Sequence, residues 1–327
     1  MEKQMGTDKT KTESKFKVHI VNSVKGGSGK STFSMLLADH FVRNGEDAYV
    51  IDLDLCGTSW YSDFKGFWQE EPRKFIQDLM YSPCEKGFAT DVWAKLKVTS
   101  KDELGEYDNR QINVCISAQD QNERLCDTPD VELLEHITYH LITEALTENG
   151  EKGGGIHFIL DLPPSHEAAA EQICHRLFFD NNSLLNQNED YCGKFYINLY
   201  MMTPLDQISA WEKNQTYVHD LIYGQRKYSS TIQSFLKTSD QRMKICFVII
   251  DNHGWEHATG QKIDPKSSPV KGLKTQLPEG CEVAYLPFVG FKFKEEISVL
   301  GQNGSAERLD ISPVEKTTIS DILEIMK

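Results

Sequence analysis

Apolar runs rich in β-branched residues alternate along this chain with stretches whose apolar residues recur at helical spacing. Seven of the runs predict strands, because each is short and is followed by a turn or helix signal: 17–24, 48–53, 112–117, 156–162, 195–202, 244–251 and 282–287. Such alternation is typical of strand–helix–strand crossovers. It predicts an α/β fold, with a doubly wound, mainly parallel sheet of about seven strands and helices on both faces.

Helices are expected between the strands, at 31–43, 131–146 and 205–223. The first has its apolar residues on one face and is followed by Asn44-Gly45, a pair that commonly ends a helix. We expect residues 1–15 to be a flexible polar tail and residues 16–327 to form a single domain. Insertions are expected where the alternation is interrupted, at 60–110, 180–194 and 252–280.

The bulk composition narrows the class of protein. The 327 residues are 39% hydrophobic, and no apolar run approaches the roughly 20 residues that span a bilayer. The first residues lack the apolar core of a secretory signal, and the eight cysteines form no C-x-x-C pair, which together favour a cytoplasmic protein with reduced thiols. A net charge of -14 disfavours nucleic acid as a partner, although a local basic face stays possible.

The most informative segment is KGGSGKST, residues 25–32, which joins the first predicted strand to the first predicted helix. Its glycines allow the backbone to turn amides inward as an anion nest at a helix N-terminus. Lys30 is expected to reach the β- and γ-phosphates of a nucleotide, and the Ser31 hydroxyl to bind Mg²⁺. The common pattern G-x-x-x-x-G-K-[ST] is not met, because Val24 occupies its first glycine position. The residues of this segment expected to contact the nucleotide are Gly26, Gly27, Ser28, Gly29, Lys30, Ser31 and Thr32.

With Lys25 included, the segment resembles the deviant Walker A motif of the ParA/MinD/Mrp family of P-loop ATPases. In that family the extra lysine reaches the partner's phosphates in a nucleotide-sandwich dimer. The resemblance therefore implies an ATP-dependent homodimer in which Lys25 and Lys30 are both catalytic. A cation at that position would neutralise charge on the transferring phosphoryl group.

Two aspartates end the second predicted strand. Strand alternation points Asp52 and Asp54 to the same side of the chain. Phosphoryl transfer needs carboxylates that support Mg²⁺ and orient the attacking water. The D-x-D-x-x-G pattern is similar to the family's switch I, which implies that Asp54 is catalytic and that Asp52 supports Mg²⁺. Two loop aspartates that cap a turn are the structural alternative.

Asp161 ends the fourth predicted strand, the Walker B arrangement, and is the third candidate for the metal site. The two prolines after it resemble the family's switch II, D-x-P-P-G, with Ser165 in place of the glycine. A serine there is expected to stiffen the loop. Thr203-Pro204 resembles the family's T-P turn and is expected to shape the pocket wall.

Adenine is the expected base. GTPases of this fold read guanine through N-K-x-D, and no such tetrad follows the sixth predicted strand. The family's equivalent positions imply that Asn252 hydrogen-bonds the adenine and that Pro287 packs on it. A turn residue at the strand end is an equal alternative for Asn252. The expected cofactors are ATP and Mg²⁺.

Further features separate the branches of the family. An iron-sulfur carrier would have a C-terminal C-x-x-C, which this sequence lacks. Residues 317–327 predict a helix with an apolar face but few cations, which favours packing in the core or a dimer over membrane binding. An aromatic stripe follows Asp54, and we expect it to be core, with a partner surface as the alternative. Its members are Trp60, Tyr61, Phe64, Phe67 and Trp68.

Three functions stay open on the sequence alone. The first is a slow, partner-stimulated ATPase switch whose dimer positions, partitions or loads an unidentified protein partner or cargo. The second is an ATP-dependent small-molecule kinase or ligase, which would need an acceptor pocket that the sequence does not reveal. The third is a scaffold that binds nucleotide without hydrolysing it.

Overall fold

A computed structural model describes the chain over residues 16–54, 60, 68–81, 92–101, 107–117, 131–149, 155–163, 175–180, 182–205, 207–225, 227–237, 242–251, 277–286 and 313–326. Within these ranges the strands form one twisted sheet of nine strands in the order β3-β4-β5-β2-β6-β1-β7-β8-β9. The strands are β1 (Phe16–Asn22), β2 (Asp47–Asp52), β3 (Trp68–Glu70), β4 (Ala94–Lys101), β5 (Tyr107–Cys115), β6 (Ile156–Asp161), β7 (Phe195–Pro204), β8 (Met243–Ile250) and β9 (Cys281–Leu286). The helices are α1 (Lys30–Arg43), α3 (Ile76–Tyr81), α4 (Val131–Asn149), the π-helix η2 (His175–Phe179), α6 (Leu184–Gln187), α7 (Ile208–Tyr223), α8 (Ser229–Lys237) and α12 (Pro313–Ile325).

The seven strands expected from the apolar pattern all appear. They lie side by side in the order β5-β2-β6-β1-β7-β8-β9, and each pairs in parallel with its neighbours in this series. The expected number of strands is too low by two, because the edge strand β3 and its neighbour β4 were not predicted; β4 pairs antiparallel with β3 on one side and with β5 on the other. Both lie within 60–110, expected as an insertion, so this range extends the sheet. The sequence of β4, AKLKVTSK, is rich in lysine, as is common near a sheet edge, and this obscured its strand pattern.

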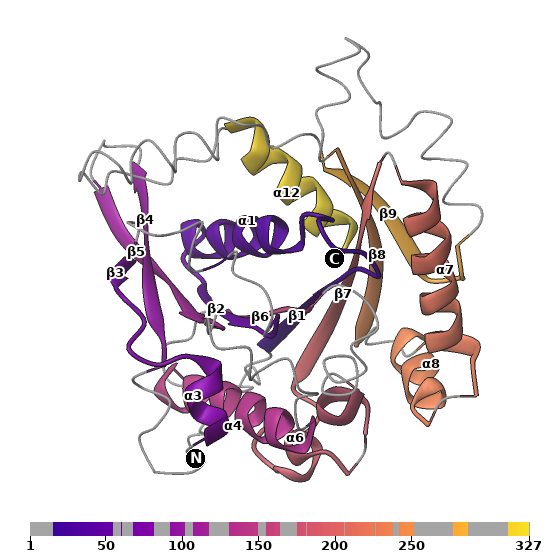
Figure 1. Cartoon of the computed structure of the whole chain (residues 1–327), viewed down its shortest axis with the longest axis horizontal. Helices are drawn as coiled ribbons and strands as arrows, with labels where there is room; N and C mark the ends of the chain where they lie inside the picture. The colour runs from indigo at the N-terminus through magenta and orange to yellow at the C-terminus, as the bar shows by residue number, and fades with distance from the viewer. Residues whose placement is uncertain are drawn as a thin grey trace, which may run out of the picture.

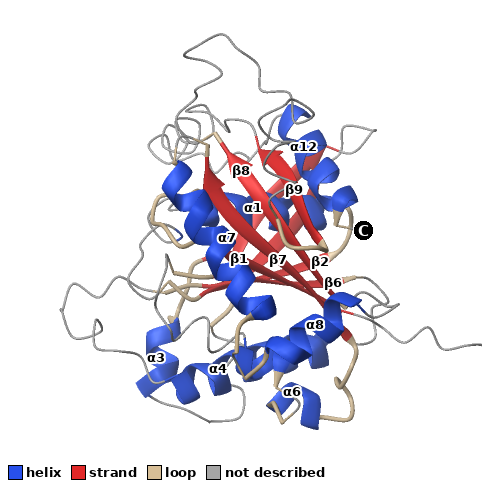
Figure 2. Ribbon diagram, turned by 90° about the vertical axis from the view of Figure 1, so that its right-hand side faces the viewer, coloured by secondary structure: helices blue, strands red, loops and turns tan. Residues whose placement is uncertain are grey.

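Two apolar clusters cover the two faces of the sheet. On one face α1 packs against alternate residues of the central strands, and α12 packs beside α1 and over the edge strand β9. On the other face lie the remaining helices, with α4, α7 and α8 contributing buried side chains (Figure 1, Figure 2). The central strand β1 is buried at every position but one, because helices cover it on both sides. This is the three-layer arrangement expected of a doubly wound sheet.

The expected helices at 31–43, 131–146 and 205–223 correspond to α1, α4 and α7. Helix α1 ends at Arg43 with Asn44 as its C-cap, and Gly45 follows with a φ of 83° in the left-handed region, as the pair predicted. At the C-terminal end, α12 buries Ile319, Ile322 and Met326 in the cluster that α1 also joins. Its apolar face therefore packs in this chain's own core. No helix in the described ranges is long and apolar enough to cross a membrane.

Candidate nucleotide-binding site

The carboxyl ends of three adjacent parallel strands bring the predicted acidic residues together. Strand β6 lies between β2 and β1 in the sheet. In the register of these strands Asp52 is opposite Asp161, and Asp161 is opposite Val21, one residue before the end of β1. Ligands of open α/β sheets bind at this edge, where the loops leave the strands. The order of strands thus joins residues that are far apart in the sequence.

The segment between β1 and α1 has the backbone that its glycines predicted. Gly27 and Gly29 have φ values of 68° and 77°, a left-handed conformation that favours glycine. Helix α1 starts at Lys30, and no side chain caps its N-terminus. The buried hydroxyl of Ser28 has no hydrogen-bond partner in the structure. A loop of left-handed glycines before an uncapped helix start is suited to binding an anion.

A buried asparagine from another layer fixes the start of this loop. Asn214 of α7 accepts a hydrogen bond from the backbone N–H of Val24 at 3.1 Å. Its amide nitrogen donates to the carbonyl of Met202 at 3.0 Å and to Oγ1 of Thr203 at 2.8 Å. The sequence analysis missed Asn214. The feature that could have identified it is its place in the sequence, because it is a polar residue on the apolar face of a helix, three positions after Trp211.

Lys30 is buried at the beginning of α1. Burial lowers the pKa of its ammonium group, while the nearby carboxyl groups of Asp161, Asp54 and Asp52 raise it in turn. The lysine and the three aspartates therefore interact electrostatically in the structure. They were predicted from three separate segments, namely the phosphate loop and the ends of two strands. A buried lysine at the start of a helix is suited to a phosphate ligand, and the carboxyl groups beside it are suited to the Mg²⁺ that accompanies a nucleotide.

Asp52 is held in place by a serine from the neighbouring strand end. The hydroxyl of Ser117, two residues after β5, donates to Oδ2 of Asp52 at 2.7 Å, and the Ser117 N–H donates to the same oxygen at 3.3 Å. The N–H of Asp54 donates to Oδ1 at 3.1 Å. Burial raises the pKa of Asp52 well above its usual range, and the neighbouring Asp161 adds to the effect. Ser117 carried no motif and was missed by the sequence analysis.

Asp161 is fully buried, which raises the pKa of its carboxyl group to about 6, although hydrogen bonds with Ser31 and Trp60 act in the opposite direction. Oδ2 accepts a hydrogen bond from the indole N–H of Trp60 at 2.8 Å. Oδ1 is buried and has no hydrogen-bond partner among the described residues. A carboxylate oxygen without a partner is a costly feature in a protein interior unless a ligand satisfies it.

The donor atoms at this edge fit magnesium bound beside a nucleotide. Oδ1 of Asp161 and the Ser31 hydroxyl are hard oxygen ligands of the kind that Mg²⁺ prefers, and the metal commonly keeps several waters. The described residues contain no group of three or more His, Cys, Asp or Glu arranged to hold a metal by themselves. The site therefore fits a metal that is shared between protein, water and phosphate oxygens.

The remaining predicted site residues fall into two groups. Lys25 is exposed, Asp54 is half-buried, and Thr32 lies in the first turn of α1. Asn252, Pro287 and Ser165 lie outside the described residues, as do the aromatic residues at 61, 64 and 67. The other members of the aromatic stripe, Trp60 and Trp68, pack in the core beside α1, as expected.

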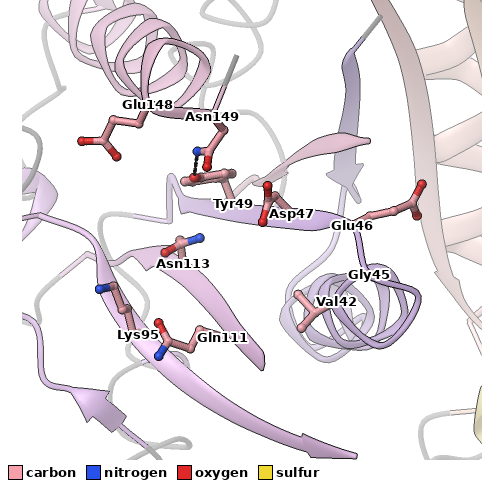
Figure 3. A pocket seen from close by; sticks show the side chains of 10 residues that line it. All are labelled: Val42, Gly45, Glu46, Asp47, Tyr49, Lys95, Gln111, Asn113, Glu148 and Asn149. Carbon is pink, nitrogen blue, oxygen red and sulfur yellow. Dashed lines mark hydrogen bonds between the residues drawn. The ribbon is translucent and has the colours of Figure 1, made fainter. Parts of the chain in front are cut away.

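An open cavity of about 600 Å³ lies near the amino end of β2, away from the carboxyl edge (Figure 3). Its lining includes Glu46, Asp47 and Glu148, and its lysine, Lys95, forms an ion pair with Glu70 at 3.1 Å. This acidic lining is poorly suited to a phosphate group. The cavity therefore does not compete with the loop as a nucleotide site.

The comparison with family models supports the resemblance. Residues 15–112 match the ParA family model described as "NUBPL iron-transfer P-loop NTPase". The match includes the phosphate loop, Asp52 and Asp54. No curated protein matches the chain significantly.

Solved structures share the fold over nearly the whole chain. The cell division ATPase MinD of Pyrococcus furiosus has a TM-score of 0.52 at 13% identity, covering 95% of this chain and 99% of its own. A ParA family ATPase of Chlorobium tepidum has a TM-score of 0.53 at 10% identity, covering 97% and 100%. A complex of a Cyanothece McdA variant with ATP has a TM-score of 0.50 at 13% identity, covering 96% and 97%. At these identities the likeness concerns the fold.

Proposed function

We propose, from the premise that this chain is a P-loop NTPase of the ParA/MinD family, that it binds and hydrolyses ATP and works as a nucleotide-dependent dimeric switch. One observation carries the proposal. Buried Lys30 lies near three carboxyl groups, and within the described ranges the buried atoms Ser28 Oγ and Asp161 Oδ1 have no hydrogen-bond partners. In bound Mg²⁺–ATP the phosphates would satisfy the lysine and the hydroxyl, and the metal would satisfy the carboxyl oxygen. The structure of the McdA variant, which is similar in fold, contains ATP.

Each residue then has a defined part in the reaction. Lys30 and the loop amides bind the β- and γ-phosphates, and Ser31 and Asp161 hold Mg²⁺, with Asp52 in support. Bound Mg²⁺ neutralises charge on the phosphate oxygens. Asp54, which is half-buried at the same edge, orients the attacking water.

The dimer proposal depends on Lys25. Its side chain is exposed, whereas Lys30 is buried in the same loop. An exposed lysine beside the phosphates is free to reach a nucleotide held by a second copy, as the resemblance implies. Closing such a dimer on ATP and opening it after hydrolysis would present two different surfaces to a partner or cargo.

Two measurements test the proposal, namely ATP turnover and molar mass with and without a slowly hydrolysed ATP analogue. We expect Lys30→Ala to abolish nucleotide binding, and Asp54→Ala to bind and dimerise but to lose turnover by about a hundredfold or more. Lys25→Ala should keep binding yet stay monomeric, while Lys213→Ala, which removes an exposed lysine from α7, should behave as wild type. A wild-type chain that binds no ATP would refute the function. Tight binding without turnover would favour a scaffold, and phosphate transfer to an added acceptor would favour a kinase.

A further inference from the structure

Trp60 connects a core side chain to the metal-site carboxylate. Its ring is fully buried in the apolar cluster that α1 shares with the sheet, six residues after Asp54 in the sequence. Its indole N–H donates to Oδ2 of Asp161 at 2.8 Å, across 101 positions of the chain. The second oxygen of the same carboxyl group, Oδ1, has no hydrogen-bond partner within the part of the chain that the structure describes.

The other buried tryptophans show that this hydrogen bond is not a general consequence of burial. Trp93 and Trp211 are also core residues, and the N–H groups of both lack an acceptor in the described structure. Packing alone is therefore sufficient to bury an indole in this protein. The N–H of Trp60 differs because it meets a carboxyl oxygen, and a hydrogen bond to a charged acceptor is among the stronger kinds.

We propose that Trp60 is a positioning residue for Mg²⁺ binding, because it occupies Oδ2 of Asp161 and leaves Oδ1 as the oxygen that serves the metal. The inference rests on the proposed function. A partial rotation of the Asp161 carboxyl group would break the indole bond, so the bond holds the plane of the group and keeps one oxygen directed away from the indole. Residues that orient a ligating carboxylate in this way commonly contribute about ten- to a hundredfold to metal affinity.

The same contact gives the protein an internal optical signal. The emission of an indole depends on its surroundings, and an N–H bonded to the metal-site carboxylate experiences the charge that arrives with Mg²⁺. Trp60 is therefore expected to report metal loading, and Trp211, which is on the other face of the sheet, is not.

The test compares Trp60→Phe, which keeps an aromatic ring and removes the donor, with Trp211→Phe, which removes an indole whose N–H has no acceptor among the described residues. The full chain is titrated with MgCl₂ at a fixed concentration of a fluorescent ATP analogue. We expect Trp60→Phe to raise the half-saturating Mg²⁺ concentration about tenfold, with metal-free analogue binding unchanged, and Trp211→Phe to match wild type. The change in tryptophan emission on adding Mg²⁺–ATP should disappear only in Trp60→Phe.

An equal Mg²⁺ dependence in wild type and a folded Trp60→Phe would overturn the inference and leave the ATPase proposal standing. A wild-type chain that fails to bind the analogue would overturn both. If Trp60→Phe does not fold, benzothienylalanine at position 60 replaces the N–H with sulfur in a ring of nearly the same shape. An unchanged Mg²⁺ dependence in that protein would overturn the inference in the same way.

Discussion

A chain of hydrogen bonds through two buried histidines predicts that acidification lowers the free energy of unfolding. Tyr200 Oη lies 3.3 Å from Nδ1 of His19, and Nε2 of His19 lies 2.9 Å from Nδ1 of His157. Nε2 of His157 lies 3.4 Å from Oε1 of Glu46. With both imidazoles neutral, every contact has one donor and one acceptor, running from the tyrosine hydroxyl to the carboxylate.

The pKa values of both histidines are lowered. For His19 the cause is burial first, then the neighbouring His157 and Lys17. For His157 burial again outweighs the hydrogen bond and charge of Glu46, which act in the opposite direction. The contact between His157 and Glu46 is therefore better described as a hydrogen bond from a neutral imidazole than as an ion pair.

The sign of the effect follows from proton uptake. Below the unfolded histidine pKa of about 6.5 the unfolded chain binds a proton that the folded chain does not, so the free energy of unfolding falls as the pH falls. For a histidine that stays neutral when folded, the loss between pH 7.5 and 5.5 is about 1.4 kcal/mol. The carboxyl groups of Asp52 and Asp161, whose pKa values are raised, act in the opposite direction over this range. The contribution of His19 is therefore measured as the difference in this pH-dependent loss of stability between wild type and a variant that lacks His19.

His19→Gln isolates that contribution, because a glutamine amide can accept from Tyr200 and donate to His157 without titrating. Urea unfolding at pH 7.5 and 5.5 should show that the variant loses about 1.4 kcal/mol less stability on acidification than wild type. His219→Gln, which replaces an exposed histidine on α7, should follow wild type. Equal losses in wild type and His19→Gln would refute the assignment of a neutral, buried His19.

Three further variants test the surroundings of the site. Asn214→Leu leaves the Val24 N–H without its acceptor and should lower the free energy of unfolding by about 1–3 kcal/mol in urea, with weaker ATP binding in a calorimeter. Ser117→Ala removes the 2.7 Å bond to Asp52 and should cost about 1–2 kcal/mol in the same urea assay at pH 7.5. The Cβ that Gly27→Ala adds meets no atom of the described residues within 4 Å, so a thermal melt should show only the backbone cost of its left-handed φ, about 1–2 kcal/mol. A loss below 0.5 kcal/mol, which is within ordinary surface variation, would contradict each of the three.

Local signals were enough to predict most of the scaffold. The central strands are buried on both faces, so their sequences are almost continuously apolar and are easily identified. Strand β4, which is next to the edge strand β3, alternates lysine with apolar residues within a range that otherwise lacks periodicity, and it was assigned to an insertion. Short helices such as α3 and α6 were missed because six or four residues carry too little helical periodicity to recognise.

Sequence motifs predicted which residues occupy the carboxyl edge, but they did not predict the residues that hold them there. Lys30, Asp52 and Asp161 each belong to a recognisable local pattern. Ser117 belongs to none, and Trp60 was recognised only as a member of an aromatic stripe, because their pairs with Asp52 and Asp161 are created by contacts between separate segments of the fold.

The strand order explains why these unrecognised partners are where they are. Because β6 lies between β1 and β2, Asp161 has the phosphate loop on one side and Asp52 on the other. Because β5 is next to β2, the residue that follows β5 can reach Asp52, and Ser117 does so with both its hydroxyl and its N–H. One additional strand between β1 and β6 would separate the carboxylates from Lys30. The function proposed here thus depends on the order β5-β2-β6-β1 as directly as on the phosphate loop itself.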